Sequence, residues 1–146
     1  MNLKRVALAG LAVFLVSQVI EYLIHGVWLQ SMYLSLKQIW RPDMESKRWI
    51  LGAVGFIVSF VFAYIFAKGY EGRGIMEGVR FGAVVGLFTA LPSAYTTYVI
   101  FPIPYSLALT WFLAGMIQTI LLGIVAALTY KPAEASTQAR PVRARG

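Results

Sequence analysis

The sequence predicts an all-α membrane protein with four transmembrane helices, and three observations lead to that prediction. The 146-residue chain is 59% hydrophobic and only 13% charged, with a mean hydropathy of +0.70. A soluble domain carries roughly 25% charged residues and about 45–50% apolar ones, so the excess apolar surface requires lipid. Four apolar runs each approach the roughly 20 residues needed to cross a hydrocarbon core.

The apolar runs set the predicted transmembrane helices. They cover residues 6–29, 49–67, 81–101 and 107–130. Backbone groups cannot stay unpaired in lipid, and strands of a membrane barrel alternate apolar and polar residues, which these runs do not. We therefore expect one helical bundle over residues 1–130, followed by a basic cytoplasmic tail over residues 131–146.

The first run follows a charged start, MNLKR, which is also typical of a signal peptide. Its apolar stretch is too long for a signal peptide, and no A-x-A-like site follows Val16. Glu21 and His25 lie where a cleavage region would be small and neutral. We interpret residues 6–29 as a retained helix.

The first connection, residues 30–48, predicts a short amphipathic helix in the outer membrane interface. Its apolar side comprises Met32, Leu36, Ile39 and Trp40. Arg41 and Pro42 would end it, since a residue before proline disfavours the helical conformation. The segment KGYEGRG predicts a Gly-rich turn, and residues 76–80 are expected to begin the third helix before it enters the membrane. FPIPYS predicts a tight turn.

Lysine and arginine set the predicted orientation, because cytoplasmic loops are enriched in both. The side shared by the termini carries nine: Lys4, Arg5, Lys68, Arg73, Arg80, Lys131, Arg140, Arg143 and Arg145. The other side carries four: Lys37, Arg41, Lys47 and Arg48. Both termini are therefore predicted to lie in the cytoplasm, with the chain in a bacterial inner membrane.

The net charge of +7 has a lipid interpretation rather than a nucleic-acid one. Most basic residues flank apolar runs, where anionic headgroups are the expected counterpart. The tail is polar and without periodicity, a composition typical of disorder. Its Arg140, Arg143 and Arg145 are expected to bind lipid headgroups, at about 1 kcal/mol each.

Small residues recur every four positions in three predicted helices. They are Gly55, Ser59, Ala63 and Ala67 in the second, Gly78, Gly82, Gly86, Ala90 and Ala94 in the third, and Gly115, Thr119 and Gly123 in the fourth. Such stripes permit close backbone approach between helices in lipid. We interpret them as packing within the bundle. The alternative is that one stripe, on the third helix, faces another subunit.

Polar side chains concentrate in the outer half of the predicted bundle. This intramembrane polar cluster comprises Gln18, Glu21, His25, Tyr95, Thr97, Tyr98 and Gln118. The first three share one face of a helix, at positions i, i+3 and i+7. We expect a small polar pocket, or a hydrogen-bonded network, that opens outward.

Glu21 and His25 admit two interpretations. A charged carboxylate at this depth is costly, so Glu21 should face the bundle, find a partner or stay protonated. A Glu–His pair one helical turn apart suits a proton relay near neutral pH. The alternative is a hydrogen-bonded pair that only fixes the first helix against the third and fourth. One His and no Cys predict neither a metal site nor a cofactor.

The stretches EYLIHGVWLQSMY, WRPDME and EGVRFGAVVGL resemble a group of small, uncharacterised bacterial four-helix integral membrane proteins. That group combines His-Gly at the end of helix one, a Tyr, Arg-Pro-acid in an outer loop, and Gly-x-Arg-Phe-Gly opening helix three. The matching positions are His25, Gly26, Tyr33, Arg41, Pro42, Gly78, Arg80, Phe81 and Gly82. Members tend to have Asn in place of Glu21, which argues against a relay. The resemblance implies the fold and no particular activity.

Three functions remain open. No motif for nucleophilic catalysis or nucleotide binding occurs, and the glycines of GRGIMEG follow no strand. The first hypothesis is an accessory or structural subunit that packs against a larger membrane complex, or a homo-oligomer. The second is a proton- or solute-transport module that uses Glu21 and His25. The third is a membrane-embedded enzyme acting on lipid, although no catalytic set of residues is evident.

Overall fold

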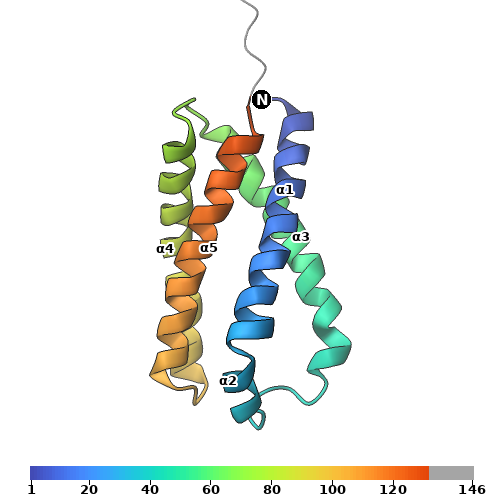
Figure 1. Ribbon diagram of the computed structural model, residues 1–146, viewed down its shortest axis with the longest axis vertical. Coiled ribbons are helices and arrows are strands. Elements are labelled where there is room, and N and C mark those ends of the chain that lie inside the picture. Colours follow the sequence, from blue (N-terminus) through green and yellow to red (C-terminus); the bar gives the residue numbers. More distant parts are fainter. Residues whose placement is uncertain (132–146) are drawn as a thin grey trace, which may run out of the picture.

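Helices make up almost the whole computed structural model, which describes residues 1–131 (Figure 1). They are α1 (Leu3–Glu21), the π-helix η1 (Tyr22–Trp28), α2 (Gln30–Ser35), α3 (Met44–Lys68), α4 (Ile75–Ile100) and α5 (Tyr105–Thr129). Taken as one, α1 and η1 form the first of four helices that are long and apolar enough to cross a membrane. The predicted all-α four-helix fold is confirmed, and the chain is a multi-pass membrane protein. The three tail arginines lie outside the described residues.

The helices begin earlier than the apolar runs predicted. Helix α3 begins at Met44, ahead of the apolar run that starts at residue 49, and α4 begins at Ile75, in agreement with the expectation that residues 76–80 open this helix before its apolar run. Each carries an acidic residue in its first turn, Glu45 or Glu77, where a carboxylate favours the positive end of the helix dipole. Polar turns of this kind need no lipid, so apolarity alone does not mark them.

The four long helices run antiparallel, so the bundle has two distinct ends (Figure 1). The N-terminus, the α3–α4 loop and the end of α5 lie at one end, which we name the terminal end. Helix α2 and the α4–α5 turn lie at the other, the α2 end. Helix α5 packs along α4 and also contacts α1, which in turn packs on α3. The halves of the bundle nearest these ends are the terminal half and the α2 half.

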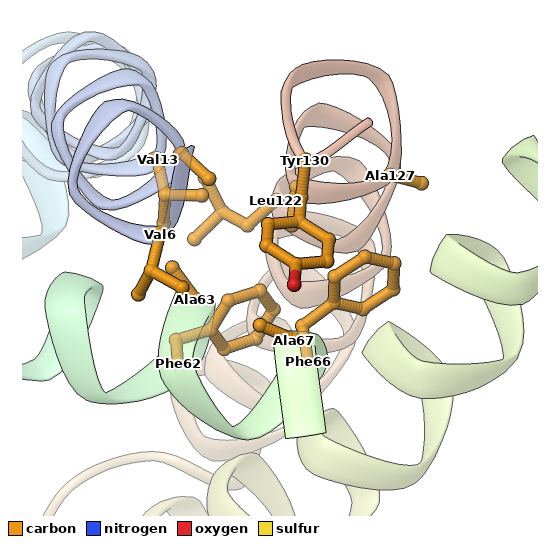
Figure 2. Packing of buried hydrophobic residues seen from close by; sticks show 11 residues of the cluster. Val6, Val13, Phe62, Ala63, Phe66, Ala67, Leu122, Ala127 and Tyr130 are labelled. Carbon is orange, nitrogen blue, oxygen red and sulfur yellow. The ribbon is translucent and has the colours of Figure 1, made fainter. Parts of the chain in front are cut away.

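The terminal half is closed by a cluster of apolar side chains from α1, α3 and α5 (Figure 2). Phe66 of α3 is only 2% exposed and lies at its centre. The ring of Phe66 meets Phe81 of α4 and Tyr130 edge-on, with ring centroids 5.3 and 6.4 Å apart. Edge-to-face aromatic pairs of this kind stabilise a core beyond the area that they bury.

Glycines bring α4 and α5 into backbone contact in the same half. A Cβ atom added at Gly78 would overlap the backbone of Gly123, and one added at Gly82 would overlap that of Thr119. The stripe on α4 therefore faces α5 rather than a free surface. Beside the cavity of the α2 half, Gly115 of α5 likewise lies against Ala90 of α4. Close approach of this kind is how helices associate in lipid. Lipid tails are as apolar as the side chains, so the hydrophobic effect does not drive helices together and close packing must do so.

The loop between α3 and α4 is held by a buried carboxylate. Glu77 is 8% exposed. Its carboxylate accepts hydrogen bonds from the backbone N–H groups of Glu71, at 2.6 Å, and Arg73, at 2.8 Å. Gly72 and Gly74 have φ angles of 77° and 71°, a backbone conformation that residues other than glycine rarely adopt. The carboxylate thus satisfies backbone donors that the loop would otherwise leave unpaired.

The first connection covers the α2 end of the bundle. Its helix ends at Ser35, before the predicted end at Arg41 and Pro42, because the chain turns at Leu36 and the Trp40 indole donates to the carbonyl of Tyr33, at 3.0 Å. The predicted apolar side chains pack on a small core rather than only facing an interface. That core comprises Leu29, Ile103, Leu107 and Ala108.

Candidate functional site

The last seven residues of the first spanning helix, Tyr22–Trp28, are wound as a π-helix that carries His25. The N–H of Leu29 closes this segment by donating to the carbonyl of Ile24, five residues back, at 2.9 Å. Such wide turns are rare, and they occur frequently at functional sites. The segment follows Glu21 directly, so the two ionisable side chains of this helix lie at the junction between two kinds of winding.

A cavity of about 460 Å³ lies between this junction and helices α4 and α5, in the α2 half. Its lining residues are Glu21, Ile24, His25, Thr89, Ala90, Ser93, Ala94, Thr97, Trp111, Ala114, Gly115, Gln118 and Thr119. Helix α4 contributes Thr89, Ser93 and Thr97, which are spaced by four and so share one face. The volume falls within the roughly 300–1,000 Å³ typical of small-molecule sites.

Five side chains form a continuous series of three hydrogen bonds and one ion-pair contact beside this cavity, and all but Tyr33 line it. The Gln118 amide donates to Glu21 Oε1 at 2.8 Å, and His25 Nε2 lies 3.3 Å from Glu21 Oε2. His25 Nδ1 is 2.5 Å from the Tyr33 hydroxyl. The Trp111 indole donates to the same hydroxyl at 2.8 Å. We name Gln118, Glu21, His25, Tyr33 and Trp111 the polar series.

Donor chemistry assigns the protons of the polar series. An indole N–H only donates, so the oxygen of Tyr33 accepts from Trp111 and its own proton is directed to His25 Nδ1. A neutral His25 then carries its proton on Nε2, the nitrogen that lies 3.3 Å from Glu21 Oε2. If His25 takes a second proton, both ring nitrogens donate and the Tyr33 proton must turn away. The same atoms therefore accommodate two protonation states.

Tyr33 remains a donor at neutral pH. Burial raises the pKa of its hydroxyl above 10.0, the nearby charge of Glu21 raises it further, and the hydrogen bond from Trp111 opposes both. Burial is the largest of the three effects. Tyr33 therefore supplies a fixed proton to the series.

The structure brings four members of the predicted polar cluster to the cavity: Glu21, His25, Thr97 and Gln118. The other three lie elsewhere. Gln18 reaches toward Gly55 of α3. The Tyr95 hydroxyl is 3.4 Å from that of Tyr105, and the Tyr98 ring packs edge-on against Tyr105 at 5.7 Å between centroids. Both tyrosines thus belong to a separate aromatic group near the α4–α5 turn.

Sequence reasoning missed Trp111 as part of the site and included Tyr33 only through the resemblance. Tyr33 comes from α2, and its place beside His25 depends on the turn at Leu29, which helical periodicity does not reveal. Thr89 and Ser93 were within reach, because they precede Thr97 at four-residue spacing on the same helix face.

No family model, curated protein or solved structure matches this chain. The resemblance to small bacterial four-helix membrane proteins therefore stays a prediction. Within residues 1–131, no group of three or more His, Cys, Asp and Glu side chains lies close enough to hold a metal ion. The side chains of the polar series offer hydrogen bonding and charge at the cavity.

Proposed function

We propose that this protein is a small transport module, in which a solute binds in the cavity of the α2 half and its movement is coupled to protons. The polar series carries this proposal, because Glu21 and His25 line the cavity and His25 is in turn bonded to Tyr33 behind it. Ionisable groups inside membrane helices are costly, and they mark solute and proton routes.

Exposure of the pair favours this function over a purely structural role. The Glu21 side chain is 47% accessible and that of His25 is 41% accessible, and both line the cavity. A pair that served only to fix α1 against α5 would be enclosed by its partners, since enclosure strengthens such bonds. Here one side of the pair contacts the protein and the other side lines the cavity.

The accessory-subunit hypothesis loses the support that it had in the sequence. The small residues of α4 and α5 pack against each other, so they offer no free stripe to a partner. The tail lies outside the described residues, so its predicted contact with lipid headgroups stays a prediction. For the enzyme hypothesis, the described loops hold ion pairs, such as Arg48 with Glu45, and no convergent catalytic set.

The distribution of Lys and Arg supports a membrane orientation with the terminal end in the cytoplasm of a bacterium. The chain has no cysteine, so single cysteines can be introduced without background. With Gln38→Cys we expect labelling of intact cells by a membrane-impermeant maleimide, and with Lys131→Cys no labelling before the cells are opened. The reverse labelling pattern would show that the terminal end faces the outside of the cell and would contradict the proposed orientation.

Transport is tested in proteoliposomes that contain a pH-sensitive dye. A panel of compact organic cations, neutral alcohols and carboxylates is imposed one at a time as a gradient. We expect at least one solute to produce a change in internal pH, and Glu21→Gln to abolish it. Glu45→Gln is the matched control, because Glu45 is exposed at the start of α3 and far along the chain from the cavity wall.

Failure of every solute in the panel would overturn the proposal. The competing hypothesis has its own readout, which is purification from the native membrane in mild detergent with mass spectrometry of the co-eluting proteins. Stoichiometric recovery with a large complex, together with an inactive panel, would restore the accessory-subunit function.

A further inference from the structure

The charges around the cavity also indicate what kind of solute it takes, an inference that rests on the proposed function. We propose that the cavity binds a compact organic cation, such as an alkylammonium ion, with its charge beside Glu21. We further propose that this cation and the second proton of His25 exclude each other. Three properties of the cavity wall support this assignment: its charge inventory, its free acceptor positions and its geometry around His25.

Among residues 1–131, the lining of the cavity holds one acid and no permanent base. Within that part of the chain, Glu21 is the one lining carboxylate, and neither Lys nor Arg lines the cavity. The titratable groups facing His25 are Glu21, from its own helix, and Tyr33, from α2. Helices α4 and α5 contribute hydroxyls, an amide, an indole and small side chains. An anionic solute would therefore meet repulsion, whereas a cation would meet the one full charge available.

Glu21 retains acceptor capacity toward the cavity. An ionised carboxylate offers about four lone-pair positions. Gln118 occupies one on Oε1, and His25 occupies one on Oε2. Each oxygen can thus accept one more bond, and the side chain is accessible from the cavity. The Trp111 indole lines the same space and offers an aromatic face of the kind that attracts ammonium groups.

Protonated His25 and a bound cation would occupy the same electrostatic position. An imidazolium with Nε2 at 3.3 Å from Glu21 already neutralises the carboxylate. A second positive charge would then be repelled by the imidazolium in a poorly screened interior. Binding of the cation therefore favours neutral His25, and the proton that leaves Nδ1 passes to the solvent. One cation enters the cavity for each proton released, which is the stoichiometry of exchange.

The test compares choline with 3,3-dimethylbutan-1-ol, which has the same shape and no charge. Titration calorimetry is performed on the full-length protein in detergent at about pH 6, close to the ordinary range of a histidine. Two buffers with different ionisation enthalpies report the number of protons released. We expect choline to bind at least about tenfold more tightly than the alcohol, as a charge-assisted contact implies. We also expect less proton release at about pH 8 than at pH 6, because protonation of a histidine falls as the pH rises.

Variants separate the roles of the two residues. Glu21→Gln should weaken choline binding at least about tenfold. His25→Gln should retain binding and lose proton release, and Glu45→Gln should change neither. If His25→Gln does not fold, the comparison of the two pH values on the unaltered protein still tests the exchange.

Equal binding of choline and the alcohol, or choline binding without proton release at the lower pH, would overturn the inference. In the proteoliposome panel, a pH response confined to neutral or anionic solutes would reject the cation class while transport itself stood. An inactive panel would remove the proposed function as well.

Discussion

The terminal half and the α2 half of the bundle differ in how their helices meet. In the terminal half, glycines of α4 touch the backbone of α5 and aromatic rings fill the space around Phe66 (Figure 2). In the α2 half, hydroxyl, amide and ionisable side chains of facing helices leave a cavity between them. Small apolar residues let backbones close on each other, whereas polar groups must find partners and so hold helices at bonding distance. The terminal half is therefore the more closely packed of the two, and the α2 half holds the cavity.

The largest effect on stability is expected from Gly82→Leu, in the closely packed terminal half. Leucine at this position would overlap the backbone of Thr119 and Ile120 and force α4 away from α5. We expect a loss of about 3 kcal/mol or more, at the upper end of overpacking effects. Thermal unfolding in detergent, followed by circular dichroism, measures it. Gly52→Leu is the control, because nothing lies within 4 Å of a Cβ atom added there. Equal melting of the two variants would contradict close contact between α4 and α5.

A smaller effect is expected at the terminal end from Glu77→Gln. The amide offers one acceptor oxygen where the carboxylate offers two, so one of the N–H groups of Glu71 and Arg73 loses its partner. Loss of a charge-assisted bond at a buried site costs about 1–3 kcal/mol. Hydrogen exchange at these two amides should accelerate, while the exposed change Glu45→Gln leaves it unaltered. Unchanged exchange would mean that the loop is held by its own backbone.

In the α2 half, Tyr33→Phe sharpens the comparison. It keeps the ring and leaves His25 Nδ1 and the Trp111 indole without their common partner. We expect a stability loss of about 1–2 kcal/mol, because the cavity lets solvent replace part of the bonding. The tautomer populations of His25, measured from its ¹⁵N spectrum, should also change. Tyr22→Phe, at a tyrosine that is 67% exposed, should change neither quantity. A silent Tyr33→Phe would remove Tyr33 from the series.

Leucine at Ser93 tests the cavity with little effect on the fold. Ser93 is exposed and lines the cavity, so the larger side chain has room to enter it. We expect stability to change by no more than about 0.5 kcal/mol, as for other exposed positions. Solute-driven pH changes in proteoliposomes should be lost. Retained transport would place the solute route outside this cavity, and the contrast with Gly82→Leu would then be only one of packing.

The weakest effect is expected at Asp43, outside the spanning segments. Its hydrogen bond with Lys47, and then that with Arg41, lower the pKa of the Asp43 carboxyl below 3.8. Since the folded pKa lies below the unfolded one, its contribution to stability is complete above pH 3.8 and is lost as the pH falls through the folded value. Lys47→Gln should raise this pKa in a ¹³C titration. Lys37→Gln, in the same connection, should not, and a shift of equal size there would mean that charge acts without contact.

Composition and periodicity were sufficient for the fold, because a bilayer demands long apolar helices and leaves little else to choose. They placed the four spans and the turn at Pro102 and Pro104. They did not reveal the polar start of α3 at Met44, whereas the start of α4 ahead of its apolar run was expected.

The site was predicted in part. The helical spacing of Glu21 and His25 was enough to put them on one face, and depth in the membrane was enough to pair them with Gln118. Tyr95 and Tyr98 were included because of their predicted depth in the membrane, but they contact Tyr105 and do not line the cavity. Depth alone does not tell which face of a helix a residue occupies. Tyr33 was missed as a partner because its position depends on the path of a connection.

The π-helical winding of Tyr22–Trp28 has a mechanical consequence. An α-helix turns by about 100° per residue, so a segment that released one extra residue and rewound would rotate the chain beyond it by about that angle. Glu21 precedes the segment and would stay in place, whereas His25 lies within it and would turn relative to Glu21. The pitch of this one segment therefore sets how His25 is oriented toward Glu21. A cycle of this kind would need no sliding of the glycine contacts between α4 and α5.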